Sequence, residues 1–122
     1  MKDENTLLSK SISEGSAEFI AELISGETDG DYSEFKGKEI EIWNDFRNDK
    51  NKSAWDSWSS WHQANKKRPK NAGYWTGYLI CKAYYKQAKN KEKAINDILS
   101  IQDHTFFYEK SNVEKYIKEK YE

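Results

Sequence analysis

The sequence predicts an all-α protein, a compact array of about five or six helices with little or no sheet. Three observations support this fold class. Apolar residues recur three and four positions apart in several segments, which is the spacing of an amphipathic helix. Valine occurs once, and no clear stretch alternates polar and apolar residues as a half-buried strand would. Aromatic residues make up 15% of the 122-residue chain, so rings must fill much of the core of the single domain expected over residues 1–122.

The first expected helix covers residues 6–25. Its apolar face consists of residues with helical spacing: Leu8, Ile12, Phe19 and Leu23. A second stripe carries acidic residues one turn apart: Glu14, Glu18 and Glu22. Gly15 indicates either a break in this helix or a close contact with another element. Gly26 is a natural C-cap that ends it.

Two shorter helices are expected next. One runs from Ser33, a possible N-cap, to about Arg47. The other covers residues 53–64 and carries three tryptophans at three-residue spacing: Trp55, Trp58 and Trp61. We expect this stripe to face the core, although it could instead line a groove for a peptide.

The strongest helical pattern covers residues 72–89. Gly73 and Gly77 are four residues apart, which makes a smooth strip where another helix can approach closely. Cys81 lies on the same face and is expected to be a small buried apolar side chain. A helix over 91–101, a short turn with Phe106 and Phe107, and a last helix capped by Ser111 complete the chain.

Composition excludes several classes of protein. No apolar run approaches the roughly 18 residues of a membrane span. Residues 1–26 are polar and acidic, so no cleavable signal peptide is expected in this chain. A lone cysteine excludes a disulfide framework and a zinc cluster of thiolates. Composition assigns neither an oligomeric state nor a function beyond a mostly helical soluble domain.

Charge is distributed unevenly along the chain. Residues 1–60 carry 7 basic and 14 acidic side chains, whereas residues 61–122 carry 13 basic and 7 acidic ones. The simplest interpretation is that the two halves attract each other within one fold. The dense run from Lys66 to Lys70 follows the tryptophans and could contact nucleic acid, but a pI near 6.2 argues against such a partner.

Four segments, in order, carry a resemblance to a known family: SISEGSAEFIAELISG (11–26), RPKNAGYWTGYLICKAYY (68–85), KEKAINDIL (91–99) and FYEKS (107–111). Together they resemble the C-terminal part of a bacterial family of predicted zinc-dependent proteases, to which gliding-motility lipoproteins of the B type are similar. The likeness covers most of the chain. Its specific part is the combination of EG-x-A-x-F-x-A-E-L with GYW-x-GY. It implies a helical, gluzincin-like catalytic domain.

The resemblance also implies roles for individual residues. In the family a His-Glu-x-x-His helix gives two zinc ligands and a general base, and a downstream carboxylate gives the third ligand. Glu14 stands at that third-ligand position. Glu18, one turn later, would accept a hydrogen bond from a ligating imidazole. Tyr74 and Tyr78 are candidate donors to the oxyanion of a tetrahedral intermediate.

His-Glu-x-x-His itself is absent from the sequence. The two histidines, His62 and His104, stand in WHQAN and DHTFF, and neither has a partner four residues away. The expectation is therefore a truncated or degenerate relative that contributes the third ligand and part of the substrate cleft but is inactive on its own. Zinc would be the cofactor of a complete relative, without tight binding to this chain. The chain alone would stay in the cytoplasm, and a full-length parent could lie in the cell envelope.

Other interpretations of the same residues stay open. The stripe of Glu14, Glu18 and Glu22 could be a solvated helix face, and the tyrosines could be core or boundary rings. The two histidines are expected to be ordinary surface or boundary residues. The second functional class is a non-catalytic helical module on the same scaffold, which would bind a peptide or a protein partner.

Overall fold

The computed structural model describes residues 5–26 and 32–122, and in these ranges the regular elements are helices joined by loops. The described residues form seven α-helices and one short 3-10 turn, η1: α1 (Leu7–Ser25), η1 (Ser33–Phe35), α2 (Glu39–Asp49), α3 (Ala54–His62), α4 (Ala72–Gln87), α5 (Lys91–Leu99), α6 (His104–Ser111) and α7 (Val113–Tyr121). Strand-like pairing in these ranges is limited to one bridge between Thr6 and Ser53. The all-α fold class is confirmed.

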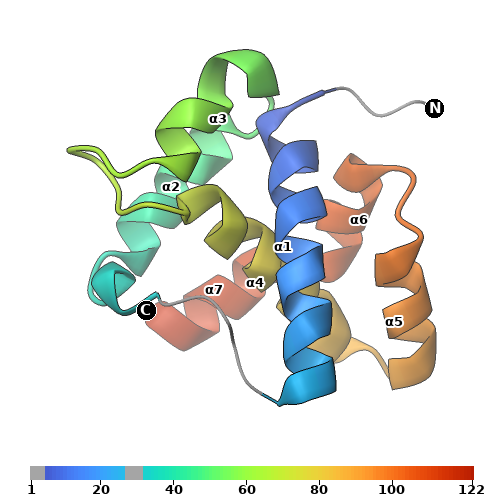
Figure 1. Ribbon diagram of the computed structural model, residues 1–122. Coiled ribbons are helices and arrows are strands. Elements are labelled where there is room, and N and C mark those ends of the chain that lie inside the picture. The colour runs from blue at the N-terminus through green and yellow to red at the C-terminus, as the bar shows by residue number, and fades with distance from the viewer. Residues whose placement is uncertain (1–4, 27–31) are drawn as a thin grey trace.

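Helix α4 lies at the centre of the arrangement. It contacts every other helix, and Figure 1 shows α1 crossing in front of it, with α2 and α3 to one side and α5 and α6 to the other. Most of its side chains are buried, including Trp75, Leu79 and Ile80. A helix that is apolar around most of its circumference is stable only inside a protein, which explains the central position of α4.

Two glycines let α1 and α4 touch through their backbones. A Cβ atom on Gly77 would collide with the carbonyl oxygen of Ser11, and one on Gly15 would collide with the backbone of Gly77 and Tyr78. The expected packing strip on α4 is therefore confirmed, and Gly15 marks a close contact rather than a break. Gly73 belongs to the same strip, but it faces the ring of Trp58 from α3.

The ends of the helices follow local capping chemistry. Thr6 and Ser9 form a reciprocal capping box at the start of α1, and Gly26 ends this helix in the left-handed conformation, with φ of 82°. Ser53 caps α3 as expected. The helix expected from Ser33 begins later, at Glu39, because Gly37 adopts a φ of 84° that interrupts the helical backbone.

Aromatic side chains fill the core as the composition indicates. The largest fully buried side chains are mainly rings: Trp61, Phe19, Phe35 and Phe46. Cys81 is buried in the same cluster, and this burial raises the pKa of its thiol. The expected turn at Phe106 and Phe107 is a full helix, α6, which raises the number of helices to seven among the described residues.

The three tryptophans of α3 do not share one buried stripe. Trp61 is buried and Trp58 is half-buried, but the Trp55 side chain is 86% exposed. Residues three apart on a helix are offset by about 60° around its axis, so three of them fan over about 120°. The buried face of α3 instead consists of residues spaced three and four apart: Ala54, Ser57 and Trp61.

The acidic and basic parts of the chain meet through a few ion pairs. Arg68 lies 3.5 Å from Asp45, and Lys82 lies 3.9 Å from Glu22, so in both cases a basic side chain of the second half faces an acidic one of the first. These pairs support the simple interpretation of the charge asymmetry. No helix within 5–26 and 32–122 is long and apolar enough to cross a membrane.

We expect Gly77→Ala to destabilise the protein by about 3 kcal/mol or more, because its new methyl group meets the rigid backbone of α1. Gly26→Ala is the matched control. Its Cβ enters open space, and only the left-handed backbone costs about 1 kcal/mol. Urea unfolding followed by tryptophan fluorescence measures both. A smaller loss for Gly77→Ala than for Gly26→Ala would contradict the close crossing.

Candidate functional site

Three glutamate–tyrosine pairs lie along one half-buried side of the α1–α4 contact. Tyr78 donates to both carboxylate oxygens of Glu22, at 2.7 and 2.5 Å. Tyr32, just before η1, donates to Glu18, and Tyr74 lies close enough to Glu14 for this carboxylate to raise its pKa. The acidic stripe of α1 is therefore not a freely solvated face, because each carboxylate is engaged by a phenol.

The spacing of the two helices creates this arrangement. Glu14, Glu18 and Glu22 repeat every turn on α1, and Tyr74 and Tyr78 repeat every turn on α4. Contact at Gly15 and Gly77 brings the two rows close enough for hydroxyl and carboxylate to bond. The segment before α2 adds the third phenol, since the Tyr32 and Tyr78 rings are 6.0 Å apart.

Basic side chains hold the two ends of the row. Lys10 forms an ion pair with Glu14 at 3.2 Å, one turn away on the same helix. Lys82 donates to the hydroxyl of Tyr78 at 3.1 Å and also approaches Glu22. Each of these carboxylates thus has a phenol and an ammonium beside it. Neither lysine could be assigned to the site from the sequence alone.

Burial and negative charge keep the phenols protonated. The pKa of Tyr32 is raised, first by burial and then by its hydrogen bond to Glu18. The pKa of Tyr74 is also raised, first by burial and then by the hydrogen bond and charge of Glu14. A neutral phenol is a hydrogen-bond donor, so both tyrosines can donate at neutral pH. This is the protonation state that an oxyanion donor needs.

An aromatic group from α3 borders the Glu14 end of the row. Trp58 stacks on His62 with ring centroids 5.9 Å apart, and both rings contact Tyr74, at 5.8 and 5.6 Å. The structure thus brings His62 beside Tyr74, although its sequence context gave it no role. His104 belongs to a different element, since it begins α6. The expected surface or boundary position of His62 is confirmed, because its side chain is exposed.

The donor set can be compared with the needs of a zinc ion. A catalytic zinc takes three protein ligands, usually from His, Glu, Asp and Cys. Within 5–26 and 32–122 no group of three such residues lies close enough together to hold a metal. Glu14 itself contacts a lysine and a tyrosine, neither of which is a usual zinc ligand here. The described residues therefore do not form a complete zinc site.

A comparison with known protein families shows to which family the chain belongs. Residues 1–107 match the family described as predicted Zn-dependent protease (DUF2268). The chain belongs to this family. The match includes all of the Glu–Tyr row and ends within α6, so the first three of the four segments that carried the resemblance lie inside it and the fourth, 107–111, begins at its end. No curated protein and no solved structure matches the chain.

Sequence reasoning found only part of this member's site. Glu14, Glu18, Tyr74 and Tyr78 were named, and the structure places all four in one row. Tyr32 was missed because it follows a polar loop and belongs to no periodic pattern. Its partner could not be identified without the tertiary contact to Glu18. A lone aromatic residue directly before an expected helix is a weak signal that could have drawn attention to it.

We expect Glu14→Gln to lower the pKa of Tyr74 toward its ordinary value of 10.0, because the mutation removes the negative charge that disfavours the phenolate. The folded protein favours the protonated phenol. The contribution of Tyr74 to the stability of the fold is therefore complete below pH 10. It is lost as the pH rises through the raised pKa that Tyr74 has in the folded protein. An NMR titration of ring-labelled tyrosine measures the pKa. Glu41→Gln, on the exposed side of α2, is the control. An unchanged Tyr74 pKa in Glu14→Gln would contradict the pairing.

Proposed function

We propose that this chain forms one wall of a zinc-peptidase active site and contributes Glu14 as a single carboxylate ligand. Family membership and the position of Glu14 within the EG-x-A motif support the role. The observation that carries the proposal is the setting of this carboxylate. Its side chain is 33% exposed, against 16% for Glu22, so it is more open to an incoming ion.

The neighbouring residues have supporting roles in this proposal. Glu18 orients an imidazole that the chain itself does not supply. Tyr74 borders Glu14, and its raised pKa keeps the hydroxyl available as a donor to an oxyanion. Tyr78 is the less accessible of the two candidate donors, because its hydroxyl already donates to Glu22 and accepts from Lys82. The same proposal includes a likeness of this chain to gluzincins and to the gliding-motility lipoproteins of the B type.

The two imidazole ligands must come from residues outside these 122, because the sequence contains no His-Glu-x-x-His. One carboxylate binds zinc weakly, since a catalytic ion needs three protein ligands. The chain by itself therefore has no peptidase activity in this proposal. It provides a pre-formed wall that another segment or another polypeptide would complete.

A second candidate is a peptide-binding module without metal chemistry. It is favoured by a surface pocket of about 400 Å³ between α4, α5 and α6. The Tyr84 ring stacks on Phe107 in its wall, and Phe106 beside them is largely exposed. An apolar side chain of an extended peptide would fit such a surface. This candidate predicts peptide binding that zinc does not change.

We expect the purified chain to show no zinc-dependent cleavage of fluorogenic peptides and only weak zinc binding. Competition with a chromophoric chelator measures the affinity. Glu14→Ala should weaken zinc binding by at least about tenfold. Residues that only support a metal ligand change the metal affinity by about that factor, and a direct ligand contributes at least as much. Glu41→Ala removes a carboxylate from the exposed side of α2 and is the matched control.

Two results would contradict this account. Zinc-dependent peptide cleavage that disappears in Glu14→Ala would show that the chain holds a complete catalytic site. Equal zinc affinity in the wild type, Glu14→Ala and Glu41→Ala would remove Glu14 from the metal site and leave the peptide-binding candidate.

A further inference from the structure

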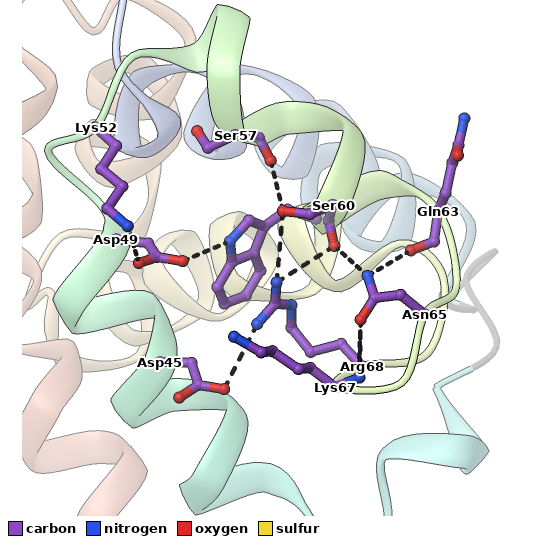
Figure 2. A network of polar contacts seen from close by, with 10 residues as sticks. Asp45, Asp49, Lys52, Ser57, Ser60, Gln63, Asn65, Lys67 and Arg68 are labelled. Atoms are coloured by element: carbon purple, nitrogen blue, oxygen red, sulfur yellow. Dashed lines mark hydrogen bonds and ion pairs between the residues drawn. The ribbon is translucent and has the colours of Figure 1, made fainter.

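A second surface feature lies on the other side of α3 from the Glu–Tyr row. It is a pocket of about 810 Å³ between the end of α2, the helix α3 and the loop 63–71. Figure 2 shows the polar side chains around it. The pocket is lined by four cationic residues, Lys52, Lys66, Lys67 and Arg68, and by two carboxylates, Asp49 and Asp56.

Arg68 is the unusual member of this group. Its side chain is only 5% exposed, and its guanidinium carbon lies over the Trp61 ring, 3.9 Å from the ring centroid. The Nε–H group is buried and has no hydrogen-bond partner. A buried donor that stays unpaired is destabilising, and more so on a charged group, so this guanidinium is under-satisfied.

The other contacts of Arg68 are long. Nη1 lies 3.5 Å from the Asp45 carboxylate, and Nη2 lies 3.4 Å from the carbonyl oxygen of Ser60 and 3.5 Å from its hydroxyl. Strong charge-assisted bonds of this type are about 2.7–2.9 Å long. Burial accordingly lowers the pKa of Arg68, and the nearby Asp45 and Asp49 only partly oppose this shift.

The carboxylates of the pocket do not neutralise this cation. Asp49 accepts from the indole nitrogen of Trp61 at 3.2 Å and pairs with Lys52 at 3.1 Å. Asp56 stands in the first turn of α3, at the other end of the helix from the Ser60 carbonyl that Arg68 contacts. With four cations and two carboxylates, the lining has an excess of two positive charges, and the ion pair of Arg68 with Asp45, which lies outside the lining, offsets one of them. The site therefore favours a negatively charged ligand.

The loop also explains why these cations lie together. The Asn65 side chain accepts from the backbone N–H groups of Lys67 and Arg68, at 2.8 and 3.1 Å, which folds the loop back toward α3. The sequence contains this basic run, but composition alone gave it no role other than a disfavoured contact with nucleic acid. In the structure Lys66, Lys67 and Arg68 of this run line the pocket, and Lys70 lies outside it.

We infer that the pocket binds the phosphate or carboxylate group of a small molecule, with Arg68 as the main recognition residue and Lys67 as a rim cation. The planar guanidinium suits an oxyanion with two oxygens in its plane, which a lysine cannot match. Arg68 lines the pocket, and binding there would add an acceptor to a guanidinium whose present contacts are long. This inference does not involve Glu14 or zinc, so it is independent of the proposed peptidase role.

The test is an NMR titration of the ¹⁵N-labelled full chain that follows the Nε–H signal of Arg68. Inorganic phosphate and acetate, added separately, distinguish a phosphate from a carboxylate ligand, and sodium chloride at matched ionic strength is the control. We expect a saturable shift with at least one of the two oxyanions and none with chloride. Arg68→Lys should weaken binding by at least about tenfold, because it replaces a forked donor by a point charge.

Arg68→Lys also disturbs the stacking on Trp61, so a second pair of variants keeps the test decisive. Lys67→Ala should weaken binding severalfold, whereas Lys70→Ala, in the same loop but outside the pocket, should leave it unchanged. Three results would overturn the inference: no saturable shift with either oxyanion, an equal effect of chloride, or equal losses in Lys67→Ala and Lys70→Ala. A shift produced only by a generic DNA oligonucleotide, with steep salt dependence, would likewise replace the pocket by a nucleic-acid surface.

Discussion

The backbone contact between α1 and α4 at Gly15 and Gly77 is the constraint on which the rest of the structure depends. Two helices normally stay 8–10 Å apart because side chains separate them. Here neither glycine has a Cβ, and each would collide with the other helix if it had one. The crossing therefore has little freedom to slide or rotate. Since α4 also contacts every other helix, its position fixes the whole array.

The same crossing determines the chemistry of the half-buried side that carries the Glu–Tyr row. It sets Glu14 and Glu22 of α1 against Tyr74 and Tyr78 of α4, and Tyr32 from outside this crossing engages Glu18 between them. Helix α3 then separates two surfaces of opposite character. Its Trp58 and His62 rings border the Glu14 end, while Ser60 and Trp61 face the cationic pocket around Arg68. A carboxylate suited to a cation and a guanidinium suited to an anion therefore lie on opposite sides of one short helix.

Local patterns in the sequence were sufficient for most of the helices and for part of the candidate site. Helical spacing located α1 and α4, and the paired glycines of α4 correctly indicated a close helix contact. Trp55 shows where such reasoning fails, because a three-residue repeat drifts around the helix and only the tertiary packing decides which member is buried. Tyr32 and Arg68 could not be assigned either. Their partners, Glu18 and Trp61, are brought to them by folding and not by spacing along the chain.

The most direct test of this account is a nuclear Overhauser measurement between the α-protons of Gly15 and Gly77. Hydrogen atoms on two backbones in contact give a strong cross-peak, and the account predicts one for this pair. It also predicts cross-peaks between the Tyr78 ring and the Glu22 side chain, because the crossing sets their partnership. A folded, helical protein that lacks the glycine cross-peak would contradict the account, since α1 and α4 would then be separated by side chains.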